Sequence, residues 1–523
     1  MTARRDIAPR VPIAFGVLWL AWNLAVAVFD LRIVTQDYAR VLLKALELVD
    51  LGIVPLDSNP VLGPLRLGPL SVYLSAIPLL FSRSLSAQYT FFAVLNGLGV
   101  LVFYMAMEAL GRRRTFRWAA TILFAFSTLV LLAVVENSTN RGIPFFLACY
   151  LFCLIQAMSG QRMFVVLTWI LVGLCMQLHL ACFVLGISTL YALNPFRNFR
   201  DMALNVLGML AALLTHIGVL FALAARLAEP VSPAAAPSML SLPASKSVGA
   251  LVVSYLGNVV EGLTFLPALA ASPLLFLLAA AGVFRLRRLS DTSAVHYRLL
   301  KTSVVHWGAS AGLYAFLFLF KDRTQVEYFQ SFVVFGAVLA ASFFADWWER
   351  RGEDRPTLGR ARTIAVGSIL VILLIGTDLM MAYRVTTTCS YKPMFRANAW
   401  TRIAEQTDDY IRERDLKGVS VRQHTYTVNP SGEVVTSVYD YHIPTAMLLL
   451  RDPRLYPRLV RDDTFAPQMY IRIVPQPLCE RAAAALTPES SDPLAASFDA
   501  GCMRVTLTGD GRMAPILPQP PSE

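Results

Sequence analysis

The chain has 523 residues, of which 56% are hydrophobic and only 15% are charged. Soluble domains carry roughly 25% charged residues. The apolar residues also gather in runs of about 18 to 22, which suffice to cross a hydrocarbon core of about 30 Å as a helix. This composition excludes an ordinary soluble protein and predicts a polytopic membrane protein. The net charge of +11 is explained by basic cytoplasmic loops, so we expect no nucleic-acid partner.

Eleven apolar segments are predicted to span the membrane. They are 12–29, 84–107, 116–135, 142–158, 163–178, 180–193, 202–225, 266–284, 302–320, 328–345 and 363–383. The first is too long for the apolar region of a signal peptide, and no small-residue cleavage site follows it, so it is expected to be retained.

Basic residues cluster at alternate junctions between these segments, which predicts a cytoplasmic N-terminus. With an odd number of spans, the tail then lies outside the cytoplasm. The 46 basic residues comprise 40 Arg and 6 Lys, a bias typical of GC-rich bacterial genomes. The predicted location is therefore a bacterial inner membrane.

The first outer loop begins with TQDYARVLLKALELVDLG, residues 35–52. Its apolar residues recur at helical spacing, while Arg40, Lys44 and Glu47 share the opposite face. The pattern predicts an interfacial helix with its apolar face toward the lipid. A second interfacial helix is expected at GPLSVYLSAIPLLFS, residues 68–82.

The predicted spans divide the chain into a transmembrane catalytic domain, 1–383, and a soluble α+β domain, 384–523. In the tail, AWTRIAEQTDDYIRERD has helical periodicity, and GVSVRQHTYTV and GEVVTSVYDY flank a turn-forming Asn-Pro-Ser-Gly. MYIRIVP and CMRVTLTG predict further strands. The fold class expected is mainly α, with an extracytoplasmic α+β domain at the C-terminus.

Several short motifs of the first loop resemble the GT-C glycosyltransferases. They are Asp37-Tyr38, Gly52-Ile53-Val54-Pro55, the run from Gly68 to Ala76, and Leu80-Phe81. The most similar branch is family 39-like, with the protein O-mannosyltransferases and the aminoarabinose transferases of lipid A. Members of the family often carry Asp-Glu in this loop, whereas Gln36 and Tyr38 flank Asp37 here. The resemblance covers roughly residues 10–345 in architecture.

The resemblance implies transfer of a sugar from a polyprenyl-phosphate carrier to an acceptor hydroxyl of a protein, glycan or lipid at the outer membrane surface. A carboxylate can serve as the general base, and Asp37 is the first candidate; the alternative is that it only caps the helix. Glu136 is a second catalytic candidate, or an ordinary solvated loop residue. No zinc pattern is present, and a divalent metal ion held by these two carboxylates remains open.

A leaving phosphate needs cations, and Arg favours bidentate contacts. The predicted outer cations are Arg66, Arg141, Lys321 and Arg323; alternatively, they reach toward lipid headgroups. The residues expected to bind substrate are Tyr38, Tyr73, Gln177, His179 and Tyr328. His179 lies between two short apolar helices, where it could instead satisfy backbone groups.

Two other functions fit a polytopic chain. A transporter or flippase is typically built from internal repeats, with ionisable residues near mid-membrane; no convincing repeat is present, and the charges cluster at span ends. A non-catalytic envelope-assembly protein would depend on its tail and not on Asp37. Loss or retention of function on replacing Asp37 separates these hypotheses.

Overall fold

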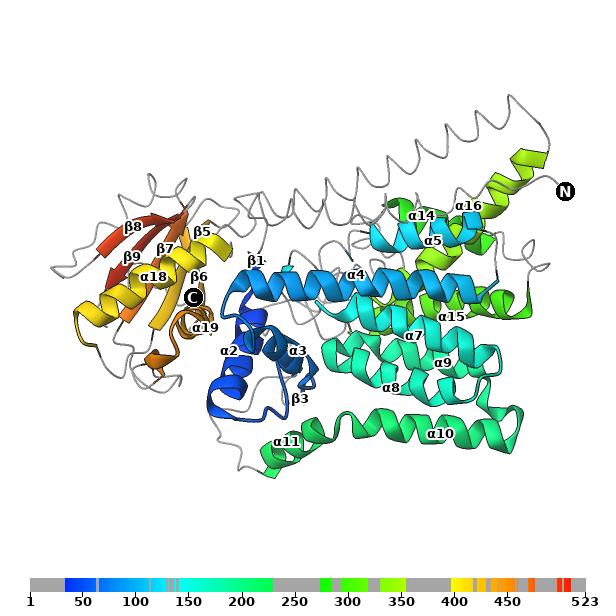
Figure 1. Cartoon of the computed structure of the whole chain (residues 1–523), viewed down its shortest axis with the longest axis horizontal. Coiled ribbons are helices and arrows are strands. Elements are labelled where there is room, and N and C mark those ends of the chain that lie inside the picture. Colours follow the sequence, from blue (N-terminus) through cyan, green and yellow to red (C-terminus); the bar gives the residue numbers. More distant parts are fainter. Residues whose placement is uncertain are drawn as a thin grey trace, which may run out of the picture.

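A computed structural model shows an elongated helical bundle, with the first-loop helices and a mixed sheet at one end (Figure 1). The structure describes residues 33–62, 65–111, 114–127, 130, 136–137, 141–228, 273–284, 293–317, 330–353, 397–416, 421–428, 434–440, 442–456, 459, 469–475, 496–500 and 503–508.

The bundle is built from apolar helices that pack side by side. They are α4 (Leu85–Ala109), α5 (Arg114–Ala125), α7 (Ile143–Met158), α8 (Met163–Leu178), η1 (Leu180–Phe183), α9 (Val184–Leu193), η2 (Pro195–Arg197), α10 (Phe199–Leu214), α11 (Ile217–Ala228), α14 (Pro273–Phe284), α15 (Ala294–Leu317) and α16 (Phe332–Glu353). Helices α4, α7, α8 and α10 follow one another in contact, and α5, α16 and α14 continue from the other side of α4.

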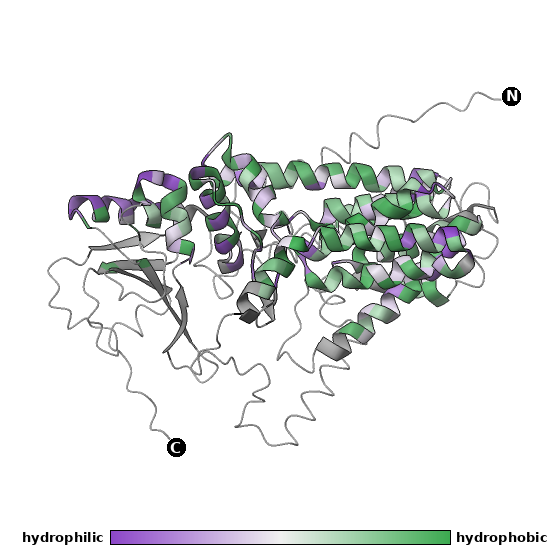
Figure 2. Cartoon of the chain, turned by 90° about the horizontal axis from the view of Figure 1, so that it is seen from below, coloured by the Kyte–Doolittle hydropathy of each residue, from purple (hydrophilic) through white to green (hydrophobic). Residues whose placement is uncertain are grey.

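Helix α10 turns polar and small residues toward the rest of the bundle and apolar residues outward. On α10, Asn205 and Gly208 are buried, whereas Leu207, Leu210 and Leu214 are exposed. The buried Asn205 accepts a 2.9 Å hydrogen bond from the indole of α8. Small and polar residues at helix contacts, with apolar residues turned outward, are typical of helices packed in lipid. Figure 2 shows the same apolar character along the length of the bundle.

One helix in the described ranges, α4, is long and apolar enough to cross a membrane, and α10 with α11 qualifies as a pair bent by 55°. The predicted spans 84–107, 142–158 and 163–178 agree with α4, α7 and α8 to within two residues. The predicted spans 12–29 and 363–383 lie outside the described residues, so the count of eleven stays a prediction.

The contact between α4 and α7 depends on Gly99. A Cβ at this position would lie 2.8 Å from the backbone Cα of Phe145, whereas a Cβ at Gly308 in α15 would meet nothing within 4 Å. Both substitutions to Ala gain the same helix propensity, but overpacking costs about 1–3 kcal/mol. We expect Gly99→Ala to unfold at a lower temperature than Gly308→Ala, as measured by thermal unfolding in detergent. Equal midpoints would show that α4 and α7 are not this close.

The first outer loop forms a compact unit against the end of α4. It contains β1 (Ile33–Val34), α2 (Gln36–Leu51), β2 (Pro60–Leu62), β3 (Leu65–Arg66) and α3 (Leu70–Leu79). Both predicted helices are present. The apolar face of α2, with Val41, Leu42, Ala45 and Leu46, is buried.

The expectation that this face of α2 meets lipid is wrong. It packs against α3 and against α19 (His442–Arg451), a helix of the C-terminal part that was not predicted. Apolar side chains are removed from water equally well by an apolar protein surface and by lipid. The amphipathic pattern alone therefore cannot distinguish these two environments. Arg83 holds this contact together by pairing with Asp50 and donating to the carbonyl oxygen of Leu449 (3.2 Å).

The C-terminal part contains a five-stranded sheet of order β6-β5-β7-β9-β8. Its elements are α18 (Ala397–Glu413), β5 (Val421–Val428), β6 (Val434–Asp440), η7 (Pro453–Leu455), β7 (Met469–Pro475), β8 (Ala496–Ala500) and β9 (Met503–Thr508). The predicted hairpin is confirmed, because β5 and β6 pair antiparallel, while β8 was not predicted. Trp400 and Ile403 share one buried cluster with α2. The domain boundary near 383 stays a prediction.

Candidate active site

Asp37 lies in the first turn of α2 with its side chain toward solvent. The side-chain oxygen of Thr35 accepts a hydrogen bond from the amide of Tyr38 (3.2 Å) and caps the helix. The alternative that Asp37 is the cap is therefore wrong. Its carboxylate is 62% exposed and lies 3.4 Å from the guanidinium of Arg40, so it is available to a substrate that approaches from outside.

The same face of α2 carries Lys44, two turns after Asp37. Its Nζ lies 2.6 Å from Oδ1 of Asp57 and donates to the carbonyl oxygens of Asp57 (3.1 Å) and Ser58 (3.2 Å). Arg66 on β3 approaches the same carboxylate at 3.9 Å. The side chain of Asp57 is only 8% exposed. A buried carboxylate held by two partly exposed cations thus fixes the loop against α2.

Asn59 closes this arrangement by donating a 2.8 Å hydrogen bond to the carbonyl oxygen of Asp37. Because α-helices rise 1.5 Å per residue, Asp37 and Lys44 are separated by about 10 Å along α2. We call Asp37, Lys44, Asp57, Asn59 and Arg66 the first-loop site. Of these, Lys44, Asp57 and Asn59 were not predicted as site residues. Asp57 and Asn59 reach α2 only because the loop folds back on the helix, and Lys44 joins the site through its contact with Asp57.

The segment that contains Glu136 runs beside the start of α2. The short strand β4 (Glu136–Asn137) pairs in parallel with β1, and Ile33 lies opposite Glu136. Ile33 precedes Asp37 by four residues, so β4 runs beside the backbone that leads into α2. The catalytic role of Glu136 stays a prediction.

Arg141 lies inside the protein, behind the first-loop site. Its guanidinium sits over the rings of Tyr38 (4.9 Å), Tyr89 (4.3 Å) and Phe92 (5.0 Å), an arrangement that favours a cation. Asn96 donates to the carbonyl oxygen of Arg141 (2.9 Å). The predicted phosphate ligand Arg141 and the predicted substrate ligand Tyr38 are thus both buried, and their proposed roles stay untested.

Burial raises the pKa of Tyr38 to about 12, although the nearby charge of Arg141 opposes this rise. The raised pKa keeps the phenol protonated throughout the physiological range. A protonated phenol cannot accept a proton, so Tyr38 is unsuited to act as a general base at neutral pH.

Gln177, at the end of α8, joins the bundle to the first loop. Its Oε1 accepts from the amide of Leu70 (3.2 Å), and its Nε2 donates to the carbonyl oxygen of Thr215 (2.6 Å). A Cβ at Gly68 would lie 2.3 Å from its Cγ. His179 is the residue at which α8 ends and η1 begins. These contacts give Gln177 a positioning role for α3, which the sequence did not predict.

Tyr73, another predicted substrate ligand, lies on α3 and donates from its hydroxyl to the carbonyl oxygen of Pro55 (3.0 Å). It therefore holds the loop that follows α2. The predicted residues Lys321, Arg323 and Tyr328 lie outside the described residues.

Comparison with solved structures decides the fold. ArnT from Cupriavidus metallidurans in the apo state matches with a TM-score of 0.51 and 15% identity, covering 97% of this chain and 100% of that chain. The chain has the GT-C fold. ArnT bound to undecaprenyl phosphate matches with a TM-score of 0.49 and 15% identity over 97% of this chain and 99% of that chain.

The oligosaccharyltransferase of Archaeoglobus fulgidus, tethered with an acceptor peptide, also matches, with a TM-score of 0.45, 13% identity, and coverage of 91% of this chain and 71% of that chain. No protein-family model and no curated protein matches the chain. The predicted resemblance to GT-C proteins is confirmed for the fold, and the apolar outer surface of the bundle agrees with a multi-pass membrane protein.

In the described part of the chain, no group of three or more His, Cys, Asp or Glu side chains could hold a metal ion. A metal ion shared by Asp37 and Glu136 stays a prediction. The basic residues Arg162, Arg298 and Lys301 line one common pocket far from the first-loop site. Which membrane face each end occupies is a prediction from charge alone.

Proposed function

We propose that the protein is a membrane glycosyltransferase that moves a sugar from a polyprenyl-phosphate carrier to an acceptor hydroxyl at the first-loop site. The observation that carries this proposal is the exposed carboxylate of Asp37 on the same helix face as Lys44, with Arg66 close by. The carboxylate and the cationic patch are separated by about 10 Å along α2. The carboxylate suits the acceptor hydroxyl, and the patch suits the leaving phosphate.

In the proposed reaction, Asp37 takes the proton of the acceptor hydroxyl as its oxygen attacks the anomeric carbon of the sugar. A new glycosidic bond forms while the bond from that carbon to the phosphate oxygen breaks. The carrier leaves as polyprenyl phosphate, keeping the electron pair of the broken bond. Lys44 and Arg66, which carry one positive charge beyond that balanced by Asp57, would stabilise the developing phosphate charge.

Apolar residues beside the site would receive the lipid part of the donor. Leu51, Val54 and Leu56, at and after the end of α2, are exposed, as are Leu80 and Phe81 after α3. Large exposed apolar residues at the end of an apolar bundle suit the membrane surface. Undecaprenyl phosphate, with which ArnT was crystallised, is a suitable carrier to test.

The proposal is tested with the purified full-length protein in liposomes that contain undecaprenyl-phosphate-linked sugars and a cell-envelope extract as the source of acceptors. Release of free undecaprenyl phosphate is measured, with and without a chelator. We expect sugar-dependent release. Movement of labelled donor across the bilayer without release would indicate the transporter alternative, and neither release nor movement with any sugar would favour the assembly alternative.

A further inference from the structure

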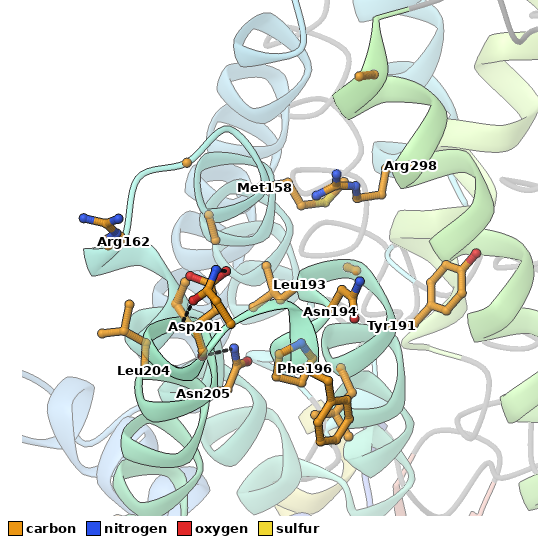
Figure 3. A pocket seen from close by; sticks show the side chains of 18 of the residues that line it. Met158, Arg162, Tyr191, Leu193, Asn194, Phe196, Asp201, Leu204, Asn205 and Arg298 are labelled. Carbon is orange, nitrogen blue, oxygen red and sulfur yellow. Dashed lines mark hydrogen bonds between the residues drawn. The ribbon is translucent and has the colours of Figure 1, made fainter.

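A second candidate site lies at the other end of the bundle. A pocket of about 1040 Å³ opens between the ends of α7, α8, α9, α10 and α15 (Figure 3). Helix α7 runs from Ile143, beside Arg141, to Met158 at the pocket. Its 16 residues span about 24 Å. The pocket is therefore separated from the first-loop site by nearly the thickness of a hydrocarbon core, about 30 Å.

The pocket is positively charged. Arg162 before α8, and Arg298 and Lys301 on α15, lie along its wall. Among the described lining residues Asp201 is the only acidic one, and its Oδ2 already accepts from the side-chain amide of Asn198 (2.8 Å). Figure 3 shows that Arg162 and Arg298 come from opposite sides of the pocket. Cations from α15 and from the residue before α8 thus lie on two sides of one space, and this arrangement favours binding of an anion.

The rest of the lining is mixed. Met158, Val165, Leu193 and Leu204 form an apolar wall, and Asn194, Asn198 and Asn205 supply amide groups. Phe196, also in the lining, is 84% exposed. Tyr191 also lines the pocket and is 45% exposed, and Tyr side chains at the ends of membrane helices are typical of the headgroup level. A ligand that contacts both the cations and the apolar wall of the pocket has an anionic head and an apolar tail.

We propose that this pocket binds the phosphate-bearing headgroup of an anionic phospholipid from the membrane leaflet opposite the first-loop site. Basic pockets between membrane helices bind such headgroups. A free phosphate ion would use the cations but would leave the apolar wall and Phe196 without a partner. The proposal does not depend on transferase activity, because it rests on a different end of the molecule.

The test uses the full-length protein in a neutral detergent, titrated with short-chain phosphatidylglycerol and, separately, with short-chain phosphatidylcholine. Binding is measured by native mass spectrometry. Each basic residue near a lipid surface contributes about fivefold in affinity, so Arg298→Gln with Lys301→Gln is expected to lower the affinity for phosphatidylglycerol about 25-fold. Phosphatidylcholine binding should be weak and should not change.

Arg200→Gln is the matched control. Arg200 is exposed in the first turn of α10, at the same end of the bundle, but it does not line the pocket. This variant should bind phosphatidylglycerol as the wild-type protein does, and all variants should keep the wild-type thermal midpoint. Equal affinity of the double variant and the wild type would overturn the proposal. Displacement of the lipid by millimolar inorganic phosphate would also overturn it, because the pocket would then recognise a soluble anion.

Discussion

Asp37→Asn is expected to lower the rate of undecaprenyl phosphate release at least about 100-fold. A positioned general base contributes roughly 10²–10⁴-fold, and the Asn amide cannot accept the proton. The substitution keeps the size of the side chain and leaves the hydrogen bond from Asn59 to the backbone carbonyl in place. Turnover and donor binding are measured separately on the reconstituted protein, and only turnover should fall.

A change in protein stability is expected to contribute little to this loss of rate. The ion pair of Asp37 with Arg40 is exposed, and such pairs contribute about 0–1 kcal/mol to the free energy of unfolding. Asp409→Asn serves as the control, since Asp409 is an exposed aspartate on α18 away from the first-loop site. A rate for Asp37→Asn within twofold of the control would show that the base lies elsewhere, with Glu136 as the next residue to replace.

Asp57→Ala is expected to destabilise the protein by about 1.5–3 kcal/mol, the range for hydrogen bonds to charged groups. Its buried carboxylate is the close acidic partner of Lys44 and also faces Arg66. Without it, the loop that carries Asn59 loses its attachment to α2, and the position of Asp37 is no longer fixed. We therefore expect a lower thermal midpoint together with slower turnover.

A double-mutant cycle with Lys44→Met separates the ion pair from other effects. Residues in direct contact show coupling energies of about 0.5–3 kcal/mol. The double variant should be less destabilised than the sum of the two single variants. Strict additivity would contradict a direct interaction between Asp57 and Lys44, whereas Glu405→Gln, on the surface of α18, should leave the effect of Lys44→Met unchanged.

Local spacing along the chain is enough to predict the helix at 35–52 and the place of Asp37 near its start. Both depend on residues that are three or four positions apart, and the structure places the helix at Gln36–Leu51. The β5–β6 hairpin was predictable for the same reason, because its turn residues lie between its two strands.

The partners of these local elements could not be predicted in this way. Asp57 meets Lys44 from 13 positions away, and Gln177 meets Leu70 from 107 positions away. The residue types alone admit many pairings, since every outer cation is an equal candidate for every carboxylate. Only the return of the loop and the crossing of α8 decide which of these pairs form.

The sequence by itself determined that this is an apolar, helical chain with a carboxylate at the start of an amphipathic first-loop helix, because composition and periodicity are local properties. The tertiary structure decided what covers that helix. Its apolar face packs against α19, about 400 positions later in the chain, and its polar face is fixed by Asp57 and Asn59. An amphipathic pattern specifies that a face is buried, but only three-dimensional packing specifies the surface that buries it.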